Sequence, residues 1–223
     1  MPGEEATPDT SKRMKDFTFR KYQDFVKSTS IFPQTNPPSA ARNLSYLFLG
    51  LVEEVGELHE KWSTPSMDSD EEAEVERTGK NPQNKIPSGY KFFTTLKELG
   101  DVCWYTTAMC NELELDIGTF IVEIRHGPPK AAIDLEVDAV TKIMQTVLGS
   151  VGGIIKKVIR DDECVIEESK KGKLLVLLRE LFSYLNGLTP AFSMDLESIM
   201  DMNMDKIKKR FAKGTVQGSG DNR

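Results

Sequence analysis

The chain has 223 residues, of which 39% are hydrophobic and 29% are charged, which is the composition of a globular protein with ample material for a core. Its formal net charge of −6 argues against a non-specific nucleic-acid binder or a binder of anionic membranes, since both need a basic surface. No apolar run approaches the roughly 18–20 residues needed to span a bilayer. We therefore expect neither nucleic acid nor membrane as a partner.

The N-terminal residues MPGEEATPDTSKRMKD lack the apolar segment of a signal peptide and begin acidic, unlike a transit peptide. Three cysteines, an odd number, give no disulfide framework. Cys103 and Cys110 lie seven residues apart on a predicted helix, where small buried side chains are a better interpretation than a metal pair. These features predict a reducing compartment, the cytoplasm or the nucleus, and we expect the cytoplasm.

In chain order, residues 1–13 are predicted to be a disordered tail. A helix follows over 16–28, with Phe17, Tyr22 and Phe25 as candidates for burial. The polar segment 63–89 is rich in charge and turn formers, and it is predicted to be an exposed insertion.

The remaining apolar residues recur at helical spacing, and no alternating stretch of convincing length suggests a strand. The predicted helices cover 42–62, 92–114, a short segment from Asp116, 136–159, 171–187 and 194–212. The sequence therefore predicts an all-α helical bundle.

The two halves of the chain resemble each other. Residues 97–121 align with 176–200 at an offset of 79, which pairs Tyr105 with Tyr184, and 51–61 align with 147–157 at an offset of 96. The pattern predicts two tandem copies over 14–125 and 130–213, followed by a Gly-rich tail over 214–223. The copies would form a pseudo-dimer within one chain.

The most unusual stretch is YLFLGLVEEVGELHEKW, residues 46–62. At about 100° per residue, its apolar residues form one stripe, and Glu53 and Glu60 point away from that stripe. Glu54 and Glu57 lie on its flank, three residues apart, so their carboxylates stack one turn above each other. For a single helix, the ordinary interpretation of such residues is a solvated acidic face.

The next helix changes that interpretation, because Glu98 falls on its core-facing stripe and Asp101 lies to one side. A buried carboxylate without a partner costs several kcal/mol, so Glu98 needs a cation, either a side chain such as Lys61 or a bound metal. If the two helices pack antiparallel, Glu54 and Glu57 meet Glu98 and Asp101. Four acidic groups would repel one another, and all-oxygen ligation suits Mg²⁺ or Mn²⁺.

Together, EEVGE at 53–57 and ELGD at 98–101 resemble the EExxE…ExxD signature of the MazG-like all-α nucleoside triphosphate pyrophosphohydrolases. The likeness includes the flanking YLFLGLVEEVGEL, ELGDVCWY and LDIGTF, and it covers residues 16–125 and 190–223. The 40 residues between Glu57 and Glu98 are more than the family usually has, because of the 63–89 insertion. That insertion leaves the choice of substrate open.

The resemblance implies Mg²⁺-dependent hydrolysis of a nucleoside triphosphate, such as a dNTP or a non-canonical NTP, to the monophosphate and pyrophosphate. It implies that Glu54, Glu57, Glu98 and Asp101 hold the metal, with Mn²⁺ as a substitute, and that Glu53 and Glu54 serve catalysis. Bound metal would neutralise the triphosphate oxygens and lower the pKa of a bound water. Relatives generally pair their helical units, so a homo-oligomer is also an expectation.

The phosphates need positive partners, and the last helix carries a polar face. The candidates for binding phosphate are Asn203, Lys206, Arg210, Lys61 and Lys213. The aromatic candidates for stacking on the base are Trp62, Trp104 and Tyr105.

These assignments suggest a division of labour between the copies. The second copy has lost most of the acids of the first, with Ser150, Gly153 and Leu177 opposite Glu54, Glu57 and Glu98 and only Glu180 opposite Asp101. Only the second copy carries the Asn/Lys/Arg face. One chain would then hold a single complete site.

The main alternative is a non-catalytic α-helical adaptor with a solvated acidic face, which would neither bind Mg²⁺ nor cleave nucleotides. A di-iron bundle requires two Glu-x-x-His pairs, and the chain has one, Glu123 with His126.

Overall fold

The structure, a computed structural model, describes residues 17–31, 40–63, 90–126 and 137–214. Its elements are α2 Phe19–Thr29, α3 Ala40–Ser63, α5 Tyr90–Glu112, α6 Ile117–His126, α7 Val137–Asp161, α8 Glu168–Leu188, the 3₁₀ turn η1 Thr189–Phe192, and α9 Leu196–Lys213. The part of the chain described contains no strand, so the predicted all-α class is confirmed. The helices begin and end within three residues of their predicted bounds.

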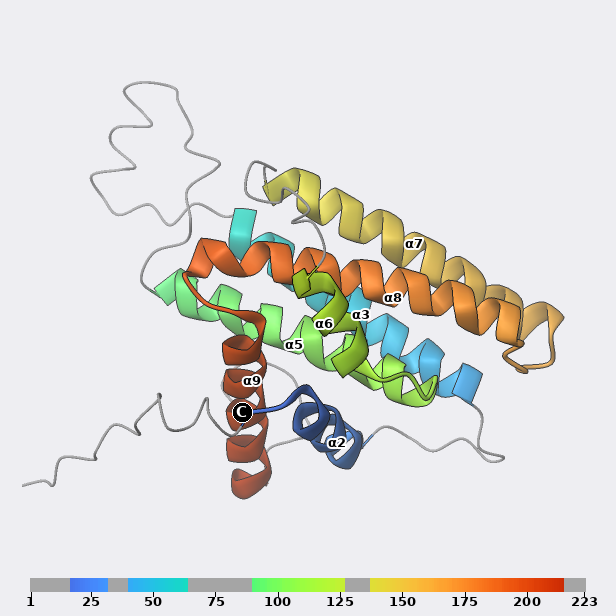
Figure 1. Cartoon of the computed structure of the whole chain (residues 1–223), viewed down its shortest axis with the longest axis horizontal. Helices are drawn as coiled ribbons and strands as arrows, with labels where there is room; N and C mark the ends of the chain where they lie inside the picture. The colour runs from blue at the N-terminus through green and yellow to red at the C-terminus, as the bar shows by residue number, and fades with distance from the viewer. Residues whose placement is uncertain (1–16, 32–39, 64–89, 127–136, 215–223) are drawn as a thin grey trace, which may run out of the picture.

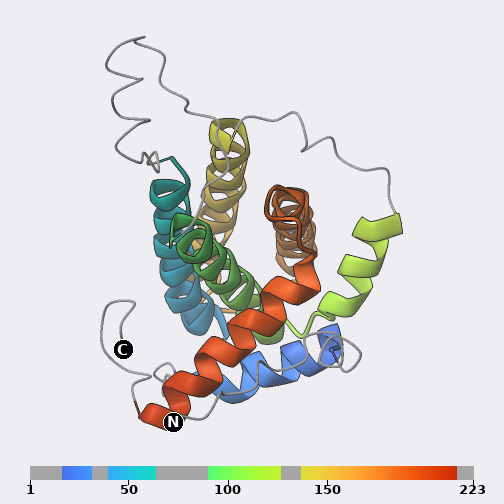
Figure 2. The same cartoon turned by 90° about the vertical axis from the view of Figure 1, so that its left-hand side faces the viewer.

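Four long helices, α3, α5, α7 and α8, form the body of the molecule (Figure 1). α3 packs against α5 and α7, and α8 packs against the same two helices from the other side. α9 crosses α5 near its middle, where Gly100 and Asp101 face Asn203, and it lies next to α2, as Figure 2 shows. α2 and α9 therefore bring residues from both ends of the chain to the middle of α5.

The apolar stripe predicted for residues 46–62 lies in the core. Its members are at most 7% exposed: Leu47, Leu51, Val55, Leu58 and Trp62. On α5, Cys103 and Cys110 are fully buried free thiols, as predicted. Burial raises the pKa of both thiols well above the usual range, so they behave as small apolar side chains.

α2 begins at a Thr18 cap, whose hydroxyl oxygen accepts a hydrogen bond from the Lys21 N–H. Of the three aromatic residues predicted to be buried near this helix, Tyr22 is fully buried. Phe17 and Phe25 are only half-buried, and the Lys208 ammonium group lies 5.6 Å from the centre of the Phe25 ring. The prediction was therefore right for Tyr22 and too strong for the two phenylalanines.

Several predictions concern residues outside the described ranges: the tail at 1–13, the insertion from residue 64 to 89, and the glycine-rich end from 215. The first predicted copy contains α2, α3, α5 and α6, the second contains α7, α8, η1 and α9, and their common origin stays a prediction. Among the described helices, none combines the length and the apolar character that crossing a bilayer requires.

Candidate metal centre

Three carboxyl groups from two helices meet at the α3–α5 interface. The helices run antiparallel: Lys61 near the end of α3 contacts Glu98 early in α5, and Asn43 near the start of α3 contacts Glu112 at the end of α5. One oxygen each from Glu54, Glu98 and Asp101 lies within 4.8 Å of the others. The predicted convergence of acids is confirmed for these three residues, and their role as metal ligands stays a prediction.

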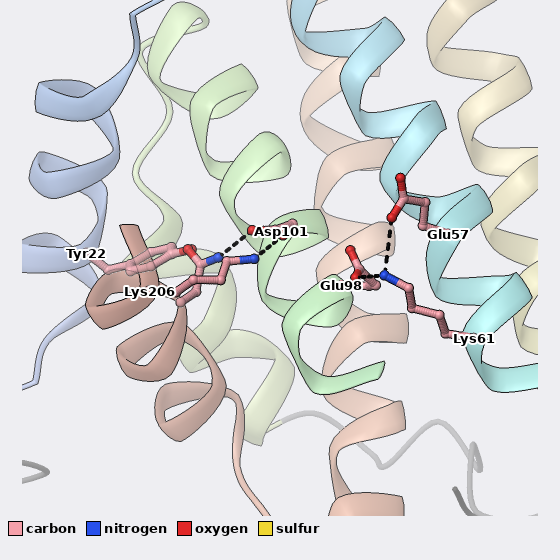
Figure 3. A network of polar contacts seen from close by, with 7 residues as sticks. Tyr22, Glu57, Lys61, Glu98, Asp101 and Lys206 are labelled. Atoms are coloured by element: carbon pink, nitrogen blue, oxygen red, sulfur yellow. Dashed lines mark hydrogen bonds and ion pairs between the residues drawn. The ribbon is translucent and has the colours of Figure 1, made fainter. Parts of the chain in front are cut away.

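Glu98 is the buried member of the cluster, at 1% exposure. The Lys61 ammonium group forms an ion pair with the Glu98 carboxylate and also lies 3.3 Å from Glu57 Oε2 (Figure 3). The predicted need of Glu98 for a cation is thus met by a lysine one turn beyond Glu57.

Glu57, predicted as a fourth metal ligand, lies at the rim of the site. Its side chain is 44% exposed, and its interaction is with Lys61. Two side chains three positions apart on a helix, such as Glu54 and Glu57, point in directions that differ by about 60°. Glu54 is therefore one of the three converging carboxyl groups, whereas Glu57 is not.

Asp101 interacts with two residues of α9. The Lys206 ammonium group pairs with Oδ2, and the Asn203 side-chain amide donates to Oδ1 over 2.8 Å. Asn203 in turn accepts a hydrogen bond of 3.0 Å from the Tyr22 hydroxyl. Figure 3 shows Tyr22 and Lys206 approaching Asp101 from the side opposite Lys61.

Burial and charge both act on Glu54. Desolvation, followed by the neighbouring Asp101 and Glu98 carboxylates, raises the pKa of Glu54 to about 9, against the opposing effect of Lys206. Glu54 is therefore protonated at neutral pH in the metal-free protein. The Lys61 and Lys206 ammonium groups and the proton on Glu54 reduce the repulsion among these acids, and the role of a divalent ion stays a prediction.

The aromatic candidates occupy different positions. Trp62 is 7% exposed, and its ring packs edge-on against Phe192 with centroids 5.2 Å apart. Trp104 packs edge-on against Tyr105 at 5.0 Å, and its indole N–H donates to the Thr29 hydroxyl over 3.3 Å. Trp62 is thus a core residue, whereas Trp104 and Tyr105 are both half-buried.

Tyr105 lies one helical turn beyond Asp101 and borders the acids. Burial, followed by the Glu54 carboxyl, raises the pKa of its hydroxyl, which stays protonated. A Cβ at Gly50 would lie 2.3 Å from the Tyr105 ring, so the glycine makes room for it. Tyr105 is therefore the predicted stacking residue that the structure places nearest the candidate ligands.

The remaining candidates lie further out. Glu53 is exposed beside Glu54, as its helical position predicted. On α9, Arg210 is half-buried and Lys213 is exposed. Gly214 adopts a left-handed conformation with φ of 66° and caps the helix through its N–H.

Two residues that matter here were missed at the sequence level. A Cβ at Gly100 would lie 2.9 Å from Asn203 Cβ, so this glycine lets α9 approach α5 closely. Tyr22 was recognised as buried, but its hydrogen bond to Asn203 was not. The available signal was a tyrosine on an apolar stripe, because a buried phenol usually finds a polar partner.

Comparison with known proteins gives one match to report. A 75-residue stretch, 34% of this chain, is 31% identical to the "Gene 37 protein" of Mycobacterium phage L5. It covers 66% of that protein, just under two thirds of its length. No protein-family model matches the chain, and no solved structure matches it.

Proposed function

We propose that this chain is a MazG-like nucleoside triphosphate pyrophosphohydrolase that uses Mg²⁺ to cleave its substrate between the α and β phosphates. The products are the monophosphate and pyrophosphate. The observation that carries the proposal is the convergence of Glu54, Glu98 and Asp101 within 4.8 Å, with Glu98 in the core. In the cell this reaction would serve housekeeping of the cytoplasmic nucleotide pool.

The donor set fits the proposed ion. All three groups offer carboxylate oxygens, which Mg²⁺ and Mn²⁺ prefer and which serve Zn²⁺ less well. Glu54, Glu98 and Asp101 would hold the metal. Glu57 lies at the rim of the site, where it contacts Lys61. Bound there, Mg²⁺ would neutralise triphosphate oxygens and lower the pKa of a water molecule.

The lysines of the site supply the remaining positive charge. Lys61 comes from α3 and Lys206 from α9, and their ammonium groups pair with Glu98 and Asp101. With a metal bound by the acids, the Lys61 and Lys206 ammonium groups would be available to the phosphates. Arg210 lies one turn beyond Lys206 on α9, in the direction of the exposed Lys213.

The same contacts support the predicted division of labour. Glu54, Glu98 and Asp101 belong to the first half of the chain, and Lys206 belongs to the second. The Lys206–Asp101 ion pair brings the two halves together at one site. Exposed Glu53, next to Glu54, is the residue proposed to orient the attacking water.

The direct test is a panel of ribo- and deoxyribonucleoside triphosphates with Mg²⁺, read by release of pyrophosphate. We expect turnover of at least one triphosphate and a loss of about 100-fold or more in Glu98→Gln, since a catalytic metal contributes several kcal/mol. Glu60→Gln, an exposed acid of the same α3 helix, is the control and should keep full activity. Activity that survives in Glu98→Gln would refute the assignment.

A non-catalytic helical adaptor is the second candidate. The observation that favours it is that Lys61 pairs with Glu98 and Lys206 pairs with Asp101, so two of the acids have cationic partners from the chain itself. This candidate requires that no triphosphate of the panel is cleaved and that Mg²⁺ leaves the thermal stability unchanged.

A further inference from the structure

A buried chain of hydrogen bonds links the first described helix to the acidic cluster. The Tyr22 hydroxyl on α2 donates to Asn203 Oδ1 on α9, and Asn203 Nδ2 donates to Asp101 Oδ1 on α5. Tyr22 is 0% exposed and Asn203 is 3% exposed. The three side chains come from three different helices, so none of these contacts is imposed by a single helix's own geometry.

The direction of this chain is chemically determined. An asparagine amide has one oxygen that accepts and one NH₂ group that donates. With Oδ1 bonded to the Tyr22 hydroxyl, the NH₂ group faces Asp101, as a carboxylate requires. The reversed amide would place its oxygen against the Asp101 carboxylate, where two acceptors repel.

The surroundings favour this single arrangement. Desolvation raises the pKa of the Tyr22 hydroxyl well above its usual value, so the group stays protonated and able to donate. Gly100 leaves room for Asn203, because a Cβ at this position would lie 2.9 Å from Asn203 Cβ and 3.2 Å from Nδ2. The amide is therefore closely enclosed between α5 and α9.

We propose that Tyr22 is a positioning residue, which acts through Asn203 to hold the Asp101 carboxylate where it meets Glu54 and Glu98. This inference rests on the proposed function, since the orientation matters because Asp101 would bind metal. It also gives Asn203 a role that differs from the predicted contact with phosphate, because both ends of its amide are already bonded within the protein.

Tyr22 would raise the affinity for metal because the Asp101 carboxylate is already held in one orientation before the metal binds. A carboxylate that rotates freely must be ordered on binding, and a partner that orders it in advance removes part of that cost. Tyr22→Phe keeps the ring in the core and removes only the hydroxyl, which leaves Asn203 Oδ1 buried without its donor. The amide is then free to turn away from Asp101.

The test is calorimetric titration of the full metal-free chain with Mn²⁺ alone, for four variants and the unmodified protein. The variants are Tyr22→Phe, Asn203→Ala, the double variant and the control Tyr184→Phe. Tyr184 also donates from its hydroxyl to a side chain, over 2.8 Å to Glu180, but this bond lies within α8. Thermal melting of each metal-free variant establishes that it is folded.

We expect Tyr22→Phe to weaken Mn²⁺ binding by about 10-fold, the lower end of what partners of metal ligands contribute. Tyr184→Phe should bind as the unmodified protein does. The double variant should bind no more weakly than Asn203→Ala, because Tyr22 acts only through Asn203. A second readout is the NMR signal of the Asn203 side-chain NH₂ group, which is assigned by its disappearance in Asn203→Ala. The hydrogens of this group should exchange slowly with water in the unmodified protein and faster in Tyr22→Phe.

The outcomes separate this inference from the proposed function. Mn²⁺ binding that is equal in Tyr22→Phe and the unmodified protein would overturn the positioning role and leave the metal site standing. Additive losses in the double variant would overturn it as well, because Tyr22 would then act independently of Asn203. If the unmodified protein took up no Mn²⁺, the proposed function would fail first and the positioning role with it.

Discussion

At residue 98 the chain places a carboxylate in its apolar core and pairs it with Lys61, whose side chain is 24% exposed. Sequence periodicity was sufficient to predict the burial of Glu98 and to name Lys61 as one of its two possible partners. It did not reveal that Lys206 would pair with Asp101, because this contact joins residues 105 positions apart. Such long-range contacts depend on how helices pack, which the helical period of one segment does not determine.

The Glu98–Lys61 pair leads to a first prediction. Lys61→Met leaves a buried carboxylate without its cation, so the free energy of unfolding of the metal-free protein should fall by about 2–3 kcal/mol, somewhat below the usual cost for a fully buried pair. Mg²⁺ should restore a substantial part of this loss. Denaturant unfolding with and without Mg²⁺ measures both effects. Lys97→Met, at an exposed lysine of α5, is the control, and equal stabilities of the two variants would contradict the prediction.

Glu54 gives a prediction about pH. Its pKa is about 9 in the folded protein against 4.5 for a free glutamate side chain, so between these values the folded state holds a proton that the unfolded state releases. The stability from this group is complete below pH 4.5 and is lost as pH rises toward 9. We therefore compare the melting temperatures of Glu54→Gln and the unmodified protein in the presence of a metal chelator. The melting temperature of Glu54→Gln minus that of the unmodified protein should rise from pH 5 to pH 9. A constant difference across this range would count against the raised pKa.

At the scale of elements, the helices themselves were largely predictable and their contacts were not. The stripe of α3 predicted which side faces the core, and antiparallel packing with α5 was the condition under which the acids of the two helices would meet. The position of α9 was not predictable, because it depends on a close approach at Gly100 that has no periodic signature. The position of Glu57 at the rim was not predictable for a related reason, since a shared flank of α3 does not decide which acid reaches α5, and its role as a ligand stays a prediction.

The close approach of α9 is testable through matched glycines. Gly100→Ala places a methyl group against Asn203 Cβ, so we expect a net loss of about 1–2 kcal/mol in the free energy of unfolding, even after the better helix propensity of alanine. Gly56→Ala on α3 meets nothing within 4 Å and should instead gain about 0.5–1 kcal/mol. Thermal or denaturant unfolding distinguishes the two, and a stabilising Gly100→Ala would show that α9 is not held tightly there.

For the molecule as a whole, the candidate site requires both ends of the chain. α3 and α5 supply the acids, α9 supplies Lys206 and Asn203, and α2 supplies the hydroxyl that bonds to Asn203. The sequence suggested this division between acidic and basic halves through the pattern of lost acids. Whether the halves arose by duplication stays a prediction, since similar helical hairpins also arise independently.

This whole-chain arrangement predicts different roles for acids and lysines. Lys206→Met removes a competitor for Asp101 and a cation proposed for phosphate, so Mn²⁺ should bind at least as tightly while kcat/KM falls by about 100-fold. Lys209→Met, at an exposed position of the same helix, should change neither quantity. Pyrophosphate release and Mn²⁺ titration provide the two readouts, and unchanged turnover in Lys206→Met would show that the second half contributes nothing to the reaction.

The central claim is that Glu54, Glu98 and Asp101 together bind a divalent cation, and the most direct measurement is Mn²⁺ titration of the metal-free protein beside Glu98→Gln. The account predicts saturable uptake by the unmodified chain and its loss in Glu98→Gln, with Glu60→Gln behaving as the unmodified chain. Absence of uptake by the unmodified chain, or equal uptake by Glu98→Gln, would contradict it.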